Sequence, residues 1–364
     1  MKRHTVVFTG GGTGGHVFPG IAIAEKLLPE KEKYKIVWIG SNSGMEKRIV
    51  ERFNIPFYSI PAGKLRRYFS IYNFIDLFKI AAGIIYSVIL LKKLKTSLIF
   101  SKGGFVTVPP VFAAKILGIQ VISHESDLDP GLATKINGRF SKKILFAYKE
   151  TKENWTKTFL KQEIIVSGNP VRKEIFEGSS FRGRTLYNIP ISKKIILILG
   201  GSQGARQINT LIQDILDELT KTYFVIHQMG KLDYKESHRE NYITASLFTD
   251  NFPDILTASN LVISRAGAGT LWESGVLGKP SILIPLGSGS SRGDQVRNAD
   301  FFEKHGAAIV LKGRKLNPNK VLDTINRLFS EKKVLNELEK NVKLLCNRDS
   351  AEIITNIIKQ ETGS

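Results

Sequence analysis

The stretch Val6-Val7-Phe8-Thr9-Gly10-Gly11-Gly12-Thr13-Gly14-Gly15-His16 (VVFTGGGTGGH) opens the chain with an apolar run that passes into a glycine-rich loop. Gly10, Gly12 and Gly15 match G-x-G-x-x-G, the pattern of a dinucleotide-binding turn between a strand and a helix. Such a loop lets backbone N–H groups approach a phosphate at a helix N-terminus. The same pattern also fits a tight turn that binds nothing, so the ligand must be argued from other residues.

A nicotinamide site needs a second feature, a carboxylate about 20 residues further on that binds the ribose hydroxyls. The second predicted strand ends in Gly40-Ser41-Asn42-Ser43, and no acidic residue follows before Glu46. A dinucleotide-dependent oxidoreductase is therefore disfavoured, and no cofactor is expected.

The composition favours an anionic partner. The 364 residues carry 53 Lys and Arg against 33 Asp and Glu, a net charge of +20, and the length suits two domains. Solvated surface lysines would give the same balance. A nucleic-acid-binding module is disfavoured because basic strands interleaved with aromatic residues are lacking. The single cysteine, Cys346, excludes an intrachain disulfide and fits a reducing compartment.

The segment Lys64–Lys95 combines basic and apolar residues. It holds seven Lys and Arg against one acid, Asp76, around the apolar run Ile80–Leu91. These 12 residues fall short of the ~20 that cross a bilayer, so no segment is expected to span a membrane. Two readings fit equally: a helix that rests on an anionic membrane surface, or a core helix with basic ends.

Short apolar runs alternate with helical patterns along most of the chain, which predicts an α/β fold of doubly wound parallel sheets. Strands are predicted at Thr5–Thr9, Lys35–Gly40, Ser97–Ser101, Gln120–Ser123, Ile144–Ala147, Ile164–Ser167, Ile195–Leu199, Phe224–Gln228, Leu261–Ser264, Ser281–Pro285 and Ala308–Leu311. Helical patterns include Ile21–Leu28, Val111–Leu117, Gln207–Leu219 and Leu271–Leu277.

The alternation pauses at Glu177–Lys193, which suits a loop between domains. Ile195–Leu199 then runs into Gly200–Ala205 and repeats the opening strand, glycine turn and helix. We therefore expect two Rossmann-like domains that face one another across a cleft. The expected domains are 1–170, which would bind the acceptor and the membrane, and 171–345, which would bind a nucleotide sugar. A last helix, about 346–364, would pack back on the first domain.

Two further clusters in the first half follow predicted strands, where ligands bind in parallel sheets. They are Ser101–Phe105 (SKGGF) and His124–Gly131 (HESDLDPG). His16, directly after the glycine loop, is a candidate general base. Asp127-x-Asp129 could hold a divalent metal, but the following Pro130-Gly131 favours an Asx-type turn, and no metal is expected.

In the second half, Ser264–Glu273 (SRAGAGTLWE) leads from a strand into a helix. Glu273 lies one turn into that helix, where a carboxylate can hold two ribose hydroxyls. Gln295 begins the next helix after a polar loop, and amide side chains of this kind commonly bind sugar hydroxyls.

Seven motifs in order between Thr9 and about Ala308 resemble the MurG family of glycosyltransferase family 28: GGTGGH, SKGGFVTVPP, HESDLDPGLA, GNPVR at Gly168–Arg172, GGSQGA, SRAGAGTLWE and GDQVRNA. The resemblance implies a GT-B fold and an inverting, metal-independent transfer of N-acetylglucosamine (GlcNAc) from UDP-GlcNAc. The acceptor would be the 4-hydroxyl of N-acetylmuramic acid (MurNAc) in undecaprenyl-linked lipid I, in peptidoglycan synthesis. It also implies peripheral attachment to the cytoplasmic face of the bacterial membrane, through about Lys64–Lys95.

The resemblance also implies roles for single residues. His16 would be the base, with Glu125 as the alternative, and Thr13, Gly14 and Gly15 would contact the donor side. Arg172 and Ser202 would bind the diphosphate, the backbone near Thr249 the uracil, and Glu273 the ribose. Gln295 would contact GlcNAc, and Asp127 would also lie on the donor. The nucleotide pocket would be lined by Ala268, Gly269, Thr270, Leu271 and Trp272.

Two positions depart from the family pattern. Many members have Asn where this chain has Asp127, and a Gln-Gln pair where it has Asp294-Gln295. The nearest rival function is transfer of a sugar from a UDP donor to diacylglycerol, which would share the glycine loops and the membrane segment.

Overall fold

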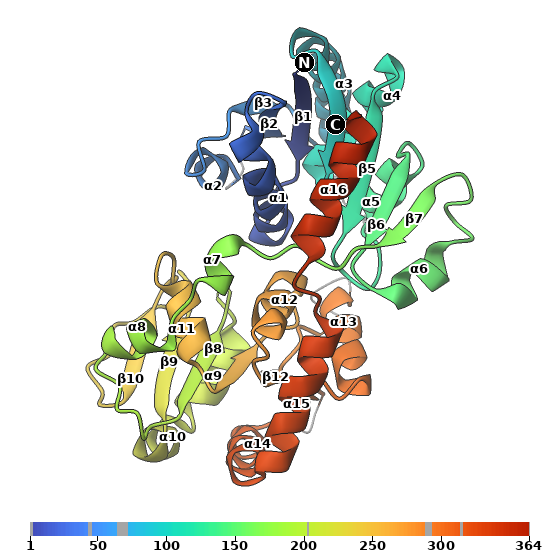
Figure 1. Cartoon of the computed structure of the whole chain (residues 1–364). Coiled ribbons are helices and arrows are strands. Elements are labelled where there is room, and N and C mark those ends of the chain that lie inside the picture. The colour runs from blue at the N-terminus through green and yellow to red at the C-terminus, as the bar shows by residue number, and fades with distance from the viewer. Residues whose placement is uncertain are drawn as a thin grey trace. The chain divides into compact units, whose positions relative to one another are not determined.

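The chain forms two compact units in a computed structural model that describes residues 3–42, 46–63, 72–201, 204–287, 293–313 and 316–363. The N-terminal unit comprises Met1–Arg172 and Arg348–Ser364, and the C-terminal unit comprises Lys173–Asn347 (Figure 1). Each unit is built around one parallel sheet, as the alternation of strands and helices predicts.

The N-terminal sheet has seven parallel strands in the order β3-β2-β1-β4-β5-β6-β7. Its strands are β1 (His4–Thr9), β2 (Tyr34–Ser41), β3 (Phe57–Ile60), β4 (Thr96–Ser101), β5 (Gln120–Glu125), β6 (Lys143–Phe146) and β7 (Glu163–Val166). Its helices are α1 (Gly14–Leu27), η1 (Leu28–Glu30), α2 (Glu46–Glu51), α3 (Tyr72–Lys93), η2 (Phe105–Thr107), α4 (Val108–Leu117), α5 (Leu132–Gly138), α6 (Lys149–Trp155) and α16 (Ser350–Thr362).

Both faces of this sheet are covered, which explains why its central strands are almost continuously apolar. Phe8 packs on one face between Trp38 and Phe100, in the same cluster as side chains of α1 and α16. Val7 points to the other face, into a cluster with side chains of α3 and α4. The central strands that lead into the glycine loops are thus packed between two hydrophobic clusters, one on each face of the sheet.

The C-terminal sheet has six parallel strands in the order β10-β9-β8-β11-β12-β13. Its strands are β8 (Ile195–Leu199), β9 (Phe224–Gln228), β10 (Tyr242–Ala245), β11 (Leu261–Ser264), β12 (Ser281–Leu283) and β13 (Ile309–Val310). Its helices are α7 (Lys173–Phe176), α8 (Ser180–Thr185), α9 (Arg206–Gln213), α10 (Leu216–Thr222), α11 (Phe252–Ala258), α12 (Ala268–Val276), α13 (Asp294–Lys304), α14 (Pro318–Ser330) and α15 (Lys332–Leu345).

The last helix, α16, belongs to the N-terminal unit and packs along α1 (Figure 1). Ile354 and Ile358 are buried in the same cluster as α1. Thr362 Oγ1 lies 3.3 Å from the hydroxyl of Tyr34, and Lys26 pairs with Glu352 at 2.6 Å. The chain therefore enters the C-terminal unit after Arg172 and returns before Arg348.

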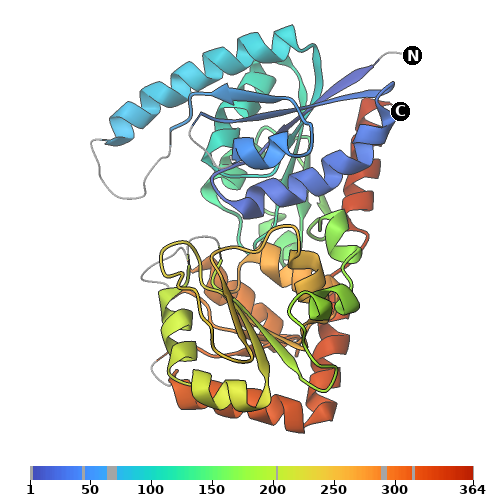
Figure 2. The ribbon, with the colours of Figure 1, turned by 90° about the vertical axis from the view of Figure 1, so that its left-hand side faces the viewer.

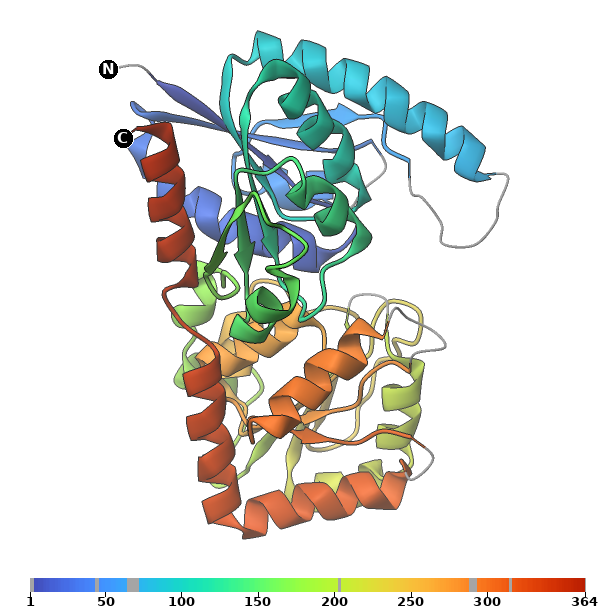
Figure 3. The same cartoon turned by 90° about the vertical axis from the view of Figure 1, so that its right-hand side faces the viewer.

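The helix α3 is longer than its sequence predicts. It spans 22 residues, and Phe74–Lys93 is long and apolar enough, by length and composition, to cross a bilayer. The expectation that no segment reaches that length is therefore wrong for this helix. Figures 2 and 3 show α3 lying along the outside of the N-terminal unit.

Two other expectations need correction. Glu177–Lys193 is not a loop between units, because it lies inside the C-terminal unit and contains α8, whose Arg182 pairs with Asp254 of α11 at 2.7 Å. The helical pattern Gln207–Leu219 forms two helices, α9 and α10. They are separated at Asp214 and Ile215, where the Ile215 backbone (φ −116°, ψ 6°) leaves helical geometry.

Candidate active site

The loops that follow β1 and β4 meet at the point where the strand order of the N-terminal sheet reverses. From β1 the strand order runs outward through β2 on one side and through β4 on the other. The backbone N–H of Lys102 donates to the carbonyl of Thr9 over 2.8 Å, so the two loops begin in contact. Ligands of open parallel sheets bind at such a switch point.

Glycine is required where these two loops touch. Gly103 and Gly104 have φ of +94° and +87°, a left-handed conformation that side chains disfavour. A Cβ on Gly104 would lie 2.4 Å from the Gly11 carbonyl oxygen and 3.2 Å from His16 Nδ1. The SKGGF and GGTGGH motifs therefore pack backbone against backbone.

His16 is oriented by two residues of its own loop. Its Nδ1 lies 3.1 Å from the carbonyl oxygen of Gly11 and 3.2 Å from Thr13 Oγ1. A carbonyl oxygen only accepts, so Nδ1 carries the proton in that bond and the lone pair of the neutral ring is on Nε2. The side chain is half-buried. This geometry gives His16 the tautomer that a general base needs at Nε2.

Glu46 supports the glycine loop from inside the unit. Its carboxylate is fully buried and accepts from the N–H and the hydroxyl of Ser41, at 3.0 and 2.6 Å. The N–H of Gly12 also donates to it, over 3.5 Å. Because the Glu46 carboxylate is buried and bonded to the loop, it is not placed to bind a ribose. It therefore does not support the hypothesis of a nicotinamide site. This structural role of Glu46 is not evident from the sequence.

Glu125, the alternative base, is engaged within its own loop. Its carboxylate accepts from the N–H groups of Ser126, Asp127 and Gly131, at 2.9, 3.2 and 2.9 Å, and from the hydroxyl of Thr134 at 2.7 Å. The side chain is buried. Glu125 therefore organises the loop that carries Asp127, which lies half-buried at the same sheet edge.

A second buried polar group went unrecognised in the sequence. Lys102, in the SKGGF motif, is only 2% exposed, and its ammonium donates to the hydroxyl of Ser126. Beside it, His124 donates from Nε2 to the carbonyl of Gly168 over 2.8 Å. Burial, and next the charge of Lys102, hold the pKa of His124 well below its usual range, so this ring is neutral.

Arg172 lies at the end of the N-terminal unit, in the segment after β7. Its guanidinium stacks over the ring of Phe18 on α1, 4.2 Å from the ring centre. A cation over the face of an aromatic ring is attracted to it, so this contact helps to place the guanidinium.

In the C-terminal unit the corresponding loops follow β8 and β11. These are the neighbouring strands between which the strand order of this sheet reverses. Ser202 lies outside the described residues. Gly201 and Gly204 on either side of residues 202–203 have φ of +75° and +98°. From the loop after β11, the Arg265 guanidinium donates to the Gln207 side chain and to the Ile284 carbonyl, both over 2.8 Å, which ties this loop to the first turn of α9 and to the residue after β12.

The residues of the SRAGAGTLWE motif that are expected to line the nucleotide pocket occupy the first turns of α12. Leu271 and Trp272 are buried, Trp272 to 1% exposure, so their side chains belong to the core. Any contact of these two residues with a ligand would therefore come from the backbone. Glu273, one residue on, is half-buried.

Two further expected contacts lie in loops of the same unit. Thr249 is exposed between β10 and α11, and its carbonyl accepts from the N–H of Phe252 over 3.2 Å. Gln295 accepts at Oε1 from the N–H of Leu286 over 3.0 Å, which fixes the plane of its amide and makes Nε2 the donor end.

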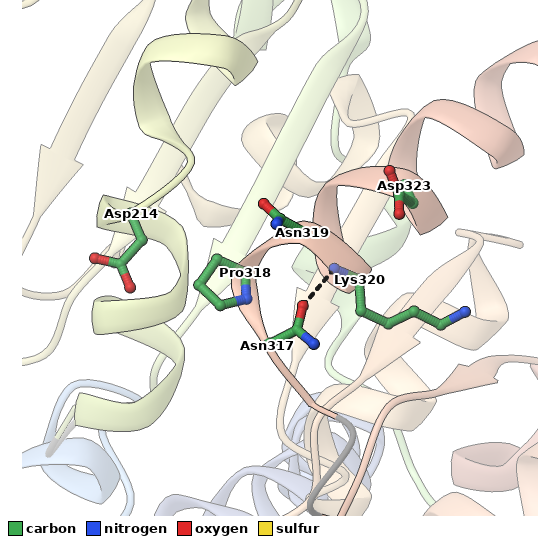
Figure 4. Close-up of a pocket in the computed structure, with 6 residues that line it drawn as sticks. All are labelled: Asp214, Asn317, Pro318, Asn319, Lys320 and Asp323. Carbon is green, nitrogen blue, oxygen red and sulfur yellow. Dashed lines mark hydrogen bonds between the residues drawn. The ribbon is translucent and has the colours of Figure 1, made fainter.

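The described residues contain no group of three or more His, Cys, Asp and Glu side chains placed to hold a metal ion. A surface pocket of about 550 Å³ lies at the N-terminus of α14, between Asp214 and Asp323 (Figure 4). No candidate site residue lines it, so it is separate from the glycine loops.

Two family models match the chain. The glycosyltransferase family 28 N-terminal domain matches residues 6–146, and the glycosyltransferase family 28 C-terminal domain matches residues 195–354. Each match begins at or next to the first strand of a unit and takes in the glycine loop that follows it.

The chain is also similar to proteins named UDP-N-acetylglucosamine–N-acetylmuramyl-(pentapeptide) pyrophosphoryl-undecaprenol N-acetylglucosamine transferase. The protein of that name from Treponema denticola is 46% identical, over 93% of this chain and 91% of the relative. That from Clostridium perfringens is 43% identical, over 93% and 94%.

Among solved structures, MurG of Acinetobacter baumannii superimposes with a TM-score of 0.74 at 24% identity, over 99% of this chain and all of that one. This likeness supports the fold, two Rossmann-like units of the GT-B type. With the identities and the two family models, it leads to one assignment: the chain belongs to the MurG family of UDP-GlcNAc-dependent glycosyltransferases.

Proposed function

We propose that this protein transfers GlcNAc from UDP-GlcNAc to the 4-hydroxyl of the MurNAc residue of undecaprenyl-linked lipid I, forming lipid II in peptidoglycan synthesis. The observation that carries the proposal is the 46% identity, over 93% of the chain, to a relative named for that transfer. The hydrogen bond from His16 Nδ1 to the Gly11 carbonyl, which orients the ring within the GGTGGH loop, supports the same chemistry.

In the proposed reaction His16 is the general base. Its Nε2 takes the proton of the acceptor 4-hydroxyl while that oxygen forms a bond to C1 of GlcNAc. The bond between C1 and the UDP oxygen breaks, and UDP leaves with the electron pair. Attack from the face opposite UDP inverts the anomeric centre. Glu125 is assigned a positioning role, because four hydrogen-bond donors of its own loop occupy its carboxylate.

The C-terminal unit is assigned the donor nucleotide. The N-terminal turn of α12, from Ala268 to Thr270, offers backbone N–H groups and the positive end of the helix dipole to negative charge on the leaving group. Glu273 would hold the ribose, Thr249 the uracil, and Gln295 would donate from Nε2 to GlcNAc. Arg172 and Ser202 keep their predicted contact with the diphosphate.

The N-terminal unit is assigned the acceptor and the membrane. Gly83 of α3 is seated so tightly that a Cβ there would lie 2.2 Å from the Pro61 carbonyl oxygen, and Ser87 is also buried. Phe78, Ile85 and Ile89 are exposed on the same helix. A helix anchored on one side and apolar on the other suits peripheral docking to the cytoplasmic face of the membrane.

The test is UDP release from UDP-GlcNAc with a short-chain lipid I analogue, compared with diacylglycerol as acceptor, with EDTA present in both. Release that depends on lipid I would support the transfer and its independence of metal. Release with diacylglycerol alone would move the protein to glycolipid synthesis and would contradict the proposal.

A further inference from the structure

Lys102 is almost completely buried, although lysine is among the residue types least often found inside proteins. It follows β4 and opens the Lys102-Gly103-Gly104 loop, which contacts the GGTGGH loop. A buried ammonium is tolerated only when hydrogen bonds satisfy its protons and nearby charges compensate it. The groups that surround the Lys102 ammonium therefore indicate its role.

One chain of hydrogen bonds leads from Lys102 across the sheet edge. The ammonium donates to Ser126 Oγ, and the Ser126 hydroxyl donates to Asn169 Oδ1 over 2.6 Å. These three residues follow β4, β5 and β7, respectively. Ser126 is next to Asp127, and Asn169 is three residues before Arg172. The chain therefore ties together the loops that carry two of the expected site residues.

Lys102 is surrounded by two carboxylates and two histidines. Burial lowers the pKa of Lys102 to about 8, while the negative charges of Glu125 and Asp127 act in the opposite direction. His124 on β5 is neutral, and His16 on α1 lies beyond Gly103, where a Cβ would be 3.8 Å from His16 Nε2. Glu125 and, to a smaller extent, Asp127 are therefore the carboxylates whose charge compensates the buried ammonium.

We propose that Lys102 is a positioning residue of the transfer site, whose buried ammonium holds the Ser126 and Asn169 loops in place and balances the charges of Glu125 and Asp127. Lys102 acts through these loops and not by contact with a substrate. The inference rests on the proposed function, because the loops carry Asp127 and Arg172, which are assigned contacts with the UDP-GlcNAc donor.

The first experiment compares Lys102→Met with Lys115→Met, which removes an exposed lysine of α4. UDP release is measured over a range of UDP-GlcNAc concentrations at a fixed concentration of the lipid I analogue, and folding is checked by thermal unfolding. Lys102→Met should lower kcat/KM on the order of tenfold, mainly by raising KM for UDP-GlcNAc, and Lys115→Met should leave it unchanged. A merely destabilising change would lower the amount of active enzyme and leave KM as it was.

The second experiment adds Asp127→Asn. Once the carboxylate is neutral, Lys102→Met should cost several-fold less in kcat/KM than it costs in the unchanged chain. The pH profile gives an independent readout. For the unchanged chain, kcat/KM should fall above about pH 8, as the ammonium loses its proton, and Lys102→Met should lack that decline.

The inference is overturned if folded Lys102→Met keeps full kcat/KM, or if its cost is the same with Asp127→Asn. If Lys102→Met does not fold, Ser126→Ala decides, since it removes only the hydroxyl that links the loops. A raised KM for UDP-GlcNAc then supports the inference and an unchanged KM overturns it. Absence of transfer by the unchanged chain would contradict the proposed function instead. In that case the free energy of unfolding still tests the charge balance. If the effects of Lys102→Met and Asp127→Asn on it are additive, the two side chains do not interact, and the charge balance is overturned.

Discussion

His16 Nδ1 lies 3.1 Å from the carbonyl oxygen of Gly11, and this contact selects the ring tautomer whose lone pair is on Nε2. If Nε2 is the base, His16→Ala should lower kcat by about 10²–10⁴-fold, the usual contribution of general-base catalysis. The Kd for UDP-GlcNAc, measured by calorimetry, should change little. Turnover equal to that of the unchanged chain would remove His16 as the base.

The close approach of Gly104 to Gly11 predicts that Gly104→Ala abolishes activity. The added Cβ meets the Gly11 carbonyl oxygen at 2.4 Å, on top of the strain of a φ of +87°. Gly118→Ala is the matched control, because Gly118 also has a positive φ, +68°, with nothing within 4 Å of an added Cβ. Both should lower the Tm, but only Gly104→Ala should abolish UDP release. Equal activity of the two variants would show that the contact is dispensable.

The buried carboxylate of Glu46 predicts that Glu46→Gln destabilises the N-terminal unit. If the amide oxygen keeps the bonds from Ser41, the NH₂ group faces the N–H of Gly12, and the opposite orientation sets it against Ser41; either costs about 1–3 kcal/mol in the free energy of unfolding. Denaturant unfolding measures this cost. Glu51→Gln, at the exposed end of α2, should cost no more than about 0.5 kcal/mol.

The docking of α16 predicts a pH dependence of stability. Glu361 pairs with Lys142 at 2.6 Å and with Lys143 at 3.3 Å. Burial raises the pKa of Glu361, but the two lysines outweigh it, so the net shift is downward. Because the folded pKa is depressed, this stability is complete above the unfolded pKa of about 4.3 and is lost as the pH falls through the folded value.

Glu361→Gln should therefore lower the free energy of unfolding by about 1.5–3 kcal/mol at pH 7, and the difference should disappear in acid. Glu352→Gln is the control on the same helix. Its ion pair with Lys26 is about half exposed and should contribute no more than about 1 kcal/mol. A Glu361→Gln deficit that stays constant down to pH 3 would contradict the assignment.

The exposed apolar face of α3 predicts that Phe78→Glu weakens binding to phosphatidylglycerol vesicles. Phe78 is 77% exposed, and losing its burial in the membrane should cost about 1.5–3 kcal/mol, roughly tenfold or more in affinity. Leu344→Glu is matched at 76% exposure on α15. It should leave vesicle binding unchanged, as measured by co-sedimentation. Equal losses in both variants would exclude α3 as the docking surface.

The central strands and the glycine loops could be predicted from the sequence because their signals are local. The strands β3 and β10 were missed because they are short edge strands with partly exposed side chains, and so lack a continuous apolar run. The break at Ile215 went unseen because α9 and α10 share one apolar period.

The sequence also predicted only part of the candidate site. His16 and Glu125 stand in recognisable motifs, but the roles of Glu46 and Lys102 depend on partners elsewhere in the chain. Glu46 reaches Gly12, 34 residues before it, and Lys102 reaches Ser126, 24 residues after it. Only the fold brings these groups together, so residue spacing carries no signal for them.

The most direct test of the transfer itself is the structure of its product. UDP-GlcNAc and a soluble lipid I analogue would be incubated with the protein in EDTA, and the isolated product analysed by NMR. The account predicts a new β-linked GlcNAc whose C1 is bonded to the 4-oxygen of MurNAc. An α-linked product, a bond to another oxygen, or a product formed only after a divalent metal is restored would contradict it.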